Sequence, residues 1–309
     1  MTTVMRKGFA ATPAIYDLAE GVIWDAQNGI VRWVNISGGQ VLAGELDGDK
    51  IVVSNTISLD QTVGTVAVAE DGGLLVAAAR CLATISPAGV ISFGPDLLGE
   101  RSNVRFNDGS PDMYGAFVVG TLTIGGDTGE ESLIRILPDG TIETLRNGIR
   151  LSNGIAFSPD GTTIYHVDTL AKTVARHSYG VGPFDIREPW VTVLDETQLP
   201  AYPDGLVVDS EGMLWVAQFG GSSVRRHSPS GELLAVVTVD AAQVTCPGFV
   251  GSKLDRLAIT SGQEGTETTD QTGAIFLADV GVTGLPTHCW AGSTTTPYWL
   301  RSESELQAP

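Results

Sequence analysis

The chain has 309 residues and a formal net charge of -18 at pH 7, from 18 Lys and Arg against 36 Asp and Glu. Nucleic acids and anionic membrane surfaces are bound by clustered Lys and Arg, so this balance argues against both as partners. The 38 glycines and a charged fraction of only 17% favour an all-β protein of short strands and tight turns.

The sequence has no recognisable targeting segment and only three cysteines. The N-terminal stretch 1–16 lacks the apolar core of a secretory signal, and no apolar run is long enough to span a bilayer, so we expect a cytoplasmic protein. The cysteines are odd in number, far apart and without metal-type spacing: Cys81, Cys246 and Cys289. This predicts buried free thiols and no disulfide framework.

Six segments along the chain share one pattern, which is a polar or small residue, an apolar strand, a turn rich in Asp, Asn and Gly, and a second apolar strand. They start at Glu20, Gly64, Asn107, Asn153, Asp204 and Phe249. The successive spacings are therefore 44, 43, 46, 51 and 45 residues. A period of about 40 to 50 residues is typical of four-stranded propeller blades.

A second hairpin follows the first within these units. It is clearest where 223–227 turns at 229–231 into 233–237, and similar turns occur at 86–89 and 138–140. Two hairpins make a four-stranded antiparallel blade, and six blades closed in a ring protect nearly all sheet edges. We therefore predict a six-bladed β-propeller.

The rest of the chain fits one domain over residues 1–309, since no linker interrupts the repeats. The segment 9–15 precedes the first unit and is expected to supply the outer strand of the last blade. Three polar, Gly-rich or acidic insertions, 96–105, 123–131 and 262–271, are expected to form loops over one mouth of the channel.

The residue before the first glycine of the unit is expected to face the central channel. It is Glu20, Asn153 and Asp204 in three units, and Asn107 stands near the same place in a fourth. Each such pair alone is a common turn former. Together, carboxylates and carboxamides are hard oxygen ligands that suit Ca²⁺ or Mg²⁺, with glycine letting backbones approach around a narrow axis.

These stretches resemble the senescence marker protein-30/gluconolactonase/luciferin-regenerating enzyme family, whose members are six-bladed propellers. The matching residues are Glu20-Gly21 with Trp24-Asp25, Arg105-Phe106-Asn107-Asp108-Gly109, Asn153-Gly154-Ile155-Ala156-Phe157-Ser158-Pro159-Asp160-Gly161, Pro203-Asp204-Gly205 with Leu214-Trp215-Val216-Ala217, and Asp255-Arg256-Leu257 with Thr260-Ser261. They follow the family's order over about residues 15 to 290.

The resemblance implies a metal-dependent hydrolase that opens sugar lactones. It implies that Glu20, Asn153 and Asp204 hold one divalent ion, most often Ca²⁺, with Zn²⁺, Mg²⁺ or Mn²⁺ as alternatives. Arg105 and Asn107 are then expected to contact substrate. The ion would polarise the lactone carbonyl, and Asp204 would be the general base that accepts a proton from the attacking water.

Other readings stay open. Similar six-bladed propellers hydrolyse phosphorus esters and fluoridates with a channel calcium, and a non-catalytic calcium-binding or regulatory protein would need only the ion site. A scaffold for protein partners would need an exposed aromatic patch, whereas aromatic residues are 7% of the chain. His166, in a strand interior, is expected to be a packed or a surface histidine and not a catalytic one. The particular lactone and the oligomeric state are not indicated.

Overall fold

The computed structural model describes residues 3–13, 15–263, 265 and 271–300. Within these ranges the chain forms twenty-five β-strands and one 3₁₀ turn, η1 (Tyr298–Leu300). The same ranges contain no helix of the length and apolarity needed to cross a membrane. The all-β class expected from the composition is confirmed.

Four sheets have four antiparallel strands each, paired in chain order as two successive hairpins. The first two are β3 (Ala19–Asp25), β4 (Ile30–Asn35), β5 (Gln40–Asp47) and β6 (Lys50–Ser58), then β7 (Val63–Val68), β8 (Leu74–Ala78), β9 (Leu82–Ile85) and β10 (Ile91–Phe93). The next two are β11 (Val104–Pro111), β12 (Phe117–Thr123), β13 (Glu131–Ile136) and β14 (Ile142–Ile149), then β15 (Ser152–Phe157), β16 (Thr163–Asp168), β17 (Thr173–Ser178) and β18 (Val191–Asp195).

The remaining strands belong to one nine-stranded sheet. They are β19 (Tyr202–Val208), β20 (Leu214–Phe219), β21 (Ser223–His227), β22 (Leu233–Thr238), β23 (Gln243–Val250), β24 (Arg256–Gly262), β25 (Phe276–Asp279), β1 (Val4–Lys7) and β2 (Phe9–Ala10). Phe219 of β20 pairs with Gln243 of β23, and this pair joins the two groups of strands. The expectation of six separate sheets is thus corrected to four separate sheets and one merged sheet, because the ends of β20 and β23 meet.

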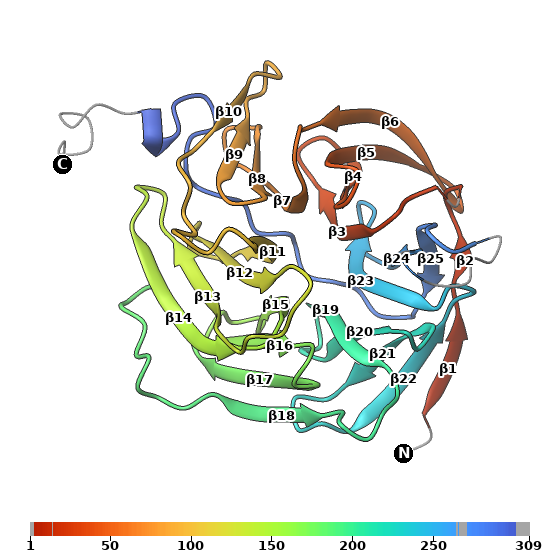
Figure 1. Ribbon diagram of the computed structural model, residues 1–309. Coiled ribbons are helices and arrows are strands. Elements are labelled where there is room, and N and C mark those ends of the chain that lie inside the picture. Colours follow the sequence, from red (N-terminus) through yellow and green to blue (C-terminus); the bar gives the residue numbers. More distant parts are fainter. Residues whose placement is uncertain (1–2, 14, 264, 266–270, 301–309) are drawn as a thin grey trace.

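The sheets stand around a common centre in a propeller-like arrangement (Figure 1). The innermost positions are taken by the first strand of each repeat: β3, β7, β11, β15, β19 and β23. Strands β7, β15 and β23 are buried along their whole length. Residues at the same place in successive repeats therefore face one axis.

The N-terminal segment pairs with strands from the far end of the chain. Strand β1 runs parallel to β22, and Phe9 and Ala10 of β2 pair antiparallel with Leu277 and Phe276 of β25. The predicted outer strand over 9–15 is confirmed for Phe9–Ala10, whereas residues 11–13 and 15 are not in a strand and residue 14 lies outside the described part. The start of the chain thus completes the sheet group β23–β25.

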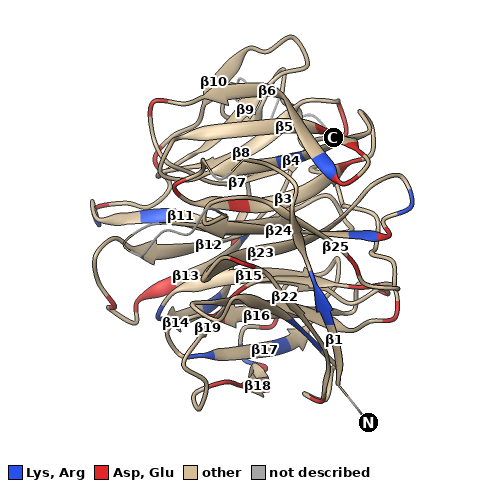
Figure 2. Cartoon of the chain, turned by 90° about the vertical axis from the view of Figure 1, so that its right-hand side faces the viewer, with Lys and Arg blue, Asp and Glu red and all other residues tan. Residues whose placement is uncertain are grey.

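Apolar side chains form the layers between neighbouring sheets. Trp215 of β20 packs edge-on against Phe249 of β23, and Phe106 and Phe117 share a cluster with Leu75 of the preceding sheet. Six such clusters are found among the described residues, and each draws side chains from two adjacent groups of strands. Lys, Arg, Asp and Glu lie mostly toward loops and strand ends (Figure 2).

All three cysteines are free thiols, as expected. Cys81 and Cys246 are buried, while Cys289 is half-buried. The absence of a disulfide means that the ring is held by sheet pairing, apolar packing and the N-terminal strands. The turn chemistry is also as predicted, since Gly161 has a φ of 68° in the β15–β16 hairpin and Asp160 accepts the Thr162 N–H at 3.1 Å.

Candidate functional site

An irregularity at the same place in each innermost strand positions the candidate residues. The pairing register shifts next to Glu20 in β3, next to Asn153 in β15, after Pro203 in β19 and between Phe106 and Gly109 in β11. A β-bulge of this kind turns side chains out of the regular alternation. Glu20, Asn107, Asn153 and Asp204 are each only 6–7% exposed.

Glycines beside these residues permit the tight ring. A Cβ built on Gly154 would lie 2.6 Å from the carbonyl oxygen of Asp204, and one built on Gly205 would lie 2.7 Å from that of Thr245. Such contacts are shorter than real side chains allow. The expectation that glycine lets neighbouring backbones approach around the axis is therefore confirmed at these two positions.

A continuous chain of hydrogen bonds links the predicted residues. Arg105 donates to Asn107 Oδ1 at 2.8 Å, and Asn107 Nδ2 donates to Asn153 Oδ1 at 2.9 Å. Asn153 Nδ2 donates to Thr169 Oγ1 at 3.0 Å, and Thr169 donates to the carbonyl oxygen of Pro203 at 2.8 Å. The structure thus brings Arg105, Asn107 and Asn153 together and connects them to the residue before Asp204.

The same contacts occupy the amide of Asn107. Besides Asn153, its Nδ2 donates to the backbone oxygen of Ser152 at 2.9 Å. A carboxamide has two N–H groups, so both are used within the protein. Asn107 therefore orients Arg105 and Asn153, and its Oδ1 retains one acceptor position.

Two buried acids, Glu20 and Asp204, and the half-buried Asp108 influence one another electrostatically at the axis. Burial raises the pKa of Glu20 well above its usual value, and the charges of Asp204 and Asp108 raise it further. Burial, followed by the charge of Asp108, also raises the pKa of Asp204, while the nearby Asn153 side chain, as a hydrogen-bond donor, lowers it in part. Burial raises the pKa of Asp108 to about 6. Burial and neighbouring negative charge disfavour the ionised forms of these acids, and a bound cation would favour them.

Glu20 and Asp204, the two acids among the predicted metal ligands, differ in the hydrogen bonds that their oxygens accept. Glu20 Oε2 accepts the N–H of Gly21 at 2.7 Å. Asp204 Oδ1 is buried and has no hydrogen-bond partner among the residues that the structure describes. A buried acceptor without a partner is costly, and a bound cation would satisfy it.

The donor set has the chemistry of a hard-cation site. Glu20, Asn153 and Asp204 offer carboxylate and carboxamide oxygens, which Ca²⁺ and Mg²⁺ prefer. Groups of three or more His, Cys, Asp and Glu arranged to hold a metal are not found in the described ranges. The set therefore depends on its asparagine as a third protein donor, and it lacks the His and Cys ligands typical of zinc sites.

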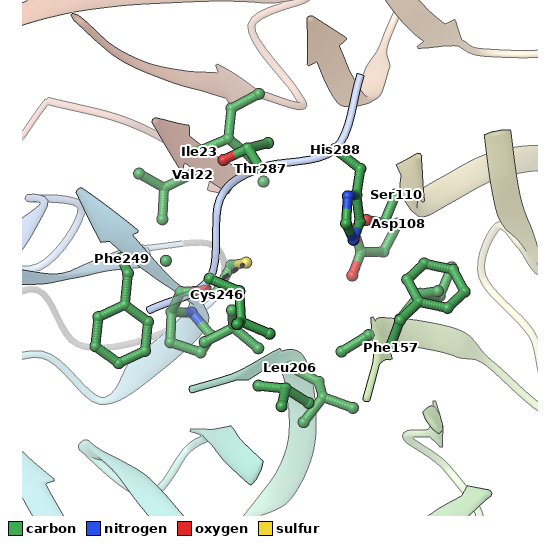
Figure 3. A pocket seen from close by; sticks show the side chains of 18 of the residues that line it. Val22, Ile23, Asp108, Ser110, Phe157, Leu206, Cys246, Phe249, Thr287 and His288 are labelled. Atoms are coloured by element: carbon green, nitrogen blue, oxygen red, sulfur yellow. Dashed lines mark hydrogen bonds between the residues drawn. The ribbon is translucent and has the colours of Figure 1, made fainter. Parts of the chain in front are cut away.

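A cavity of about 130 Å³ continues the channel beyond the acids. One side is formed by residues of the innermost strands, including Asp108, Ser110 and Cys246, and Figure 3 shows His288 beside Asp108 and Ser110. Burial lowers the pKa of His288 and raises that of Cys246. This part of the channel combines one acid with largely apolar walls.

The segment 283–291, here called the C-terminal strap, crosses the end of this cavity. Its backbone is bonded to loops of different sheets, from Ser210 N–H to Thr283 O at 2.9 Å and from Ala291 N–H to Gly115 O at 3.0 Å. Leu285, Pro286 and Thr287 of the strap line the cavity with His288. Access to the acids from this side is thus narrowed by the strap.

The insertion 123–131 is firmly attached at its ends. Glu131 is fully buried and accepts hydrogen bonds from Thr121 at 2.7 Å and from Arg101 at 2.8 Å. In the middle of the loop, Asp127 is ion-paired with Arg150, three residues before Asn153. The loop is therefore tied both to its own sheet and to the strand that carries a candidate ligand.

Three residues of the site were missed at the sequence level. Asp108 is the neighbour of Asn107, but regular alternation would point it away, and only the register shift brings both to the channel. His288 comes from the strap, outside the repeats, so no pattern indicates it. Thr169 follows Asp168 after β16 and is one of many threonines near strand ends. Of the two alternatives for His166, the structure shows the packed one: it is 0% exposed and bonded to Ser152 and Arg146.

Comparison with known proteins connects this geometry to characterised relatives. A model of the SMP-30/Gluconolactonase/LRE-like region matches residues 18–263. Pentonolactonase XacC of Haloferax volcanii is 31% identical over 87% of this chain and 93% of its own length. Regucalcin of Danio rerio is 29% identical over 89% and 95%, respectively. The crystal structure of a calcium-binding regucalcin from Agrobacterium tumefaciens superposes with a TM-score of 0.83 at 28% identity, covering 94% of this chain and 99% of that one.

Proposed function

The chain belongs to the SMP-30/gluconolactonase/LRE-like family, and on that basis we propose that it is a metal-dependent lactonase that opens sugar lactones of the aldonolactone type. Relatives that bear lactonase names over nearly the whole chain support lactone hydrolysis. The observation that carries the metal dependence is the buried, partnerless Asp204 Oδ1 among acids whose pKa values are raised.

We propose that Glu20, Asn153 and Asp204 hold one divalent ion, most readily Ca²⁺. The charges support this assignment, because the carboxylates of Glu20, Asp108 and Asp204 exceed the single positive charge of Arg105 by two. One divalent ion would balance that excess. When bound, the ion would polarise the lactone carbonyl and stabilise the oxyanion that forms on attack.

The protein's own residues would then carry the proton and orient the substrate. Asp204 accepts a proton from the attacking water as the water oxygen bonds to the carbonyl carbon. The ring C–O bond breaks, and the ring oxygen takes the proton that Asp204 accepted, which makes it a hydroxyl of the open acid and regenerates the Asp204 carboxylate. Arg105, held by Asn107 and the carbonyl oxygen of Phe106, donates to the carboxylate that forms or to ring hydroxyls.

We further infer that the propeller has six blades in one domain over residues 1–309. The nine-stranded sheet would count as two blades, β19–β22 and β23–β25 with β2, because only Phe219 and Gln243 join them. Six apolar clusters between neighbouring groups of strands support this count. The site lies where such blades would converge.

A pH-indicator screen of aldonolactones, with each divalent ion added to chelator-treated protein, tests the activity. We expect acid release with Ca²⁺ and a return to background with chelator. Turnover that a chelator leaves unchanged would contradict the metal dependence. Because the Agrobacterium relative is described as calcium-binding, a second candidate is calcium binding without turnover. Calcium binding with no hydrolysis of any lactone would favour that candidate.

The base assignment is tested with Asp204→Asn. General base catalysis contributes about 10²- to 10⁴-fold, so we expect a rate loss in that range. Metal content is measured on the same sample, and Asp185→Asn, an exposed acid paired with Arg187, serves as the control. If Asp204→Asn keeps both its metal and full activity, Asp204 is not the base.

A further inference from the structure

Thr169 lies between two strands that carry candidate ligands. It follows β16 directly, is 8% exposed, and its backbone N–H donates to Leu151 O at 3.0 Å. Its hydroxyl contacts Asn153 Nδ2 at 3.0 Å on one side and the carbonyl oxygen of Pro203 at 2.8 Å on the other. One side chain therefore bridges β15 and β19 at the level of the acids.

The direction of these two hydrogen bonds is determined by chemistry. A carbonyl oxygen only accepts, so the single proton of the Thr169 hydroxyl is donated to Pro203. The hydroxyl must then accept from Asn153, which places the Asn153 NH₂ group toward Thr169. Asn107 acts in the same sense, because its Nδ2 donates to Asn153 Oδ1.

The Asn153 carboxamide is therefore held at both ends, with its oxygen toward Asn107 and its nitrogen toward Thr169. If the Asn153 amide were rotated by 180°, its NH₂ group would face the donor Nδ2 of Asn107. Its oxygen would face the Thr169 hydroxyl, whose proton is already donated to Pro203. Both contacts would be lost. The Thr169 hydroxyl also holds the backbone of Pro203, next to Asp204, so it acts on two of the three candidate ligands.

We propose that Thr169 is a positioning residue of the ion site. Its hydroxyl fixes the orientation of the Asn153 carboxamide and the strand that carries Asp204, without itself touching ion or substrate. The proposal rests on the proposed function, since it assumes that Asn153 and Asp204 hold a divalent ion. Its effect extends through Asn153 and Asn107 to Arg105 by the same chain of hydrogen bonds.

The test compares Thr169→Val, Thr169→Ser and Thr12→Val with the wild type. Valine has nearly the shape of threonine without the hydroxyl, whereas serine keeps the hydroxyl. Thr12 is a matched control: it is 7% exposed, accepts the Ile275 N–H at 2.9 Å and donates to Pro13 O at 3.1 Å, away from the site. The measurements are the Kd for Ca²⁺ by calorimetry, kcat and KM, and the melting temperature.

We expect Thr169→Val to raise the Kd for Ca²⁺ by about 10- to 100-fold, as substitutions behind metal ligands do. Thr169→Ser should restore a Kd close to that of the wild type. Thr12→Val should lower the melting temperature and leave the Kd unchanged. Thr169→Ala, measured in parallel, provides a second hydroxyl-free variant if the valine variant does not fold.

The outcomes separate this proposal from the proposed function. A wild type that binds Ca²⁺ but opens no lactone overturns the lactonase, while the ratio of Kd values still decides the role of Thr169. A hydroxyl-free variant with wild-type Kd overturns the positioning role. So does a serine variant as weak as the valine variant, because the hydroxyl would then not be the group that matters.

Discussion

His227 is a residue whose titration should be visible in the stability of the protein. Burial lowers its pKa from 6.5 to about 4, and its Nε2 lies 3.8 Å from Glu196 Oε1. Between these two pH values the folded state keeps His227 neutral, whereas the unfolded chain binds a proton. The unfolded state therefore gains protons as the pH falls, and stability is lost.

We predict that the free energy of unfolding falls by up to about 3 kcal/mol between pH 6.5 and pH 4 through this group. Glu196 opposes part of the loss, because burial raises the pKa of its carboxyl, and Arg225 faces the same pair. Urea unfolding at several pH values, with His227→Gln as the comparison, isolates the histidine. If the free energy of unfolding falls equally with pH in the wild type and in His227→Gln, the prediction is wrong.

At the scale of the strand, the register shifts explain both what the sequence predicts and what it leaves out. The repeat spacing places Glu20, Asn153 and Asp204 at equivalent positions, so their common burial follows from the period alone. The period carries no information on the shift between Phe106 and Gly109, which brings Asp108 to the channel beside Asn107. The shift recurs at the same place in every innermost strand, but residue type does not show it, because it is defined by the pairing with the neighbouring strand.

The close approach of strands β19 and β23 at Gly205 leads to a prediction about steric strain. Gly205→Ala would place a Cβ 2.7 Å from both the Thr245 carbonyl oxygen and the Cys246 Cα. Both are backbone atoms, so the strands β19 and β23 must move apart. We expect a loss of about 1–3 kcal/mol in stability, together with weaker Ca²⁺ binding, since Asp204 precedes the glycine.

Thermal unfolding and a calcium titration check this prediction. Gly180→Ala is the matched control, because nothing lies within 4 Å of a Cβ built there. The control should behave as the wild type. A Gly205→Ala protein of wild-type stability would show that the two backbones are not in steric contact.

At the scale of the whole molecule, the repeat period predicted a closed ring, and the N-terminal segment supplies its last outer strand. The merging of two sheets could not be predicted, because it depends on the distance between the ends of β20 and β23 and not on residue type. The C-terminal strap was also missed, since it has no counterpart in the repeats. A repeat pattern predicts only the segments that recur, so it gives no information on a segment that occurs once in the chain.

Stepwise truncation tests the closure. Removal of residues 1–7 takes away β1, which is exposed along its length, whereas removal of residues 1–10 also takes away β2 and uncovers the edge of β25. We expect the second step to lower the melting temperature more than the first and to promote aggregation, since an open sheet edge can pair with other chains. Calorimetry and light scattering measure both effects; equal melting temperatures for the two truncations would contradict the closing role of β2.

The pairing of Phe9 with Leu277 also bears on how the protein is made. The two partners are separated by 268 positions along the chain. At about 5–20 residues per second, a ribosome delivers the second partner roughly 15–50 s after the first. The sheets from β3 to β18 can assemble during this interval, while β2 waits without its partner. Because β2 has only two residues, it offers a small template for wrong pairing on a crowded polysome.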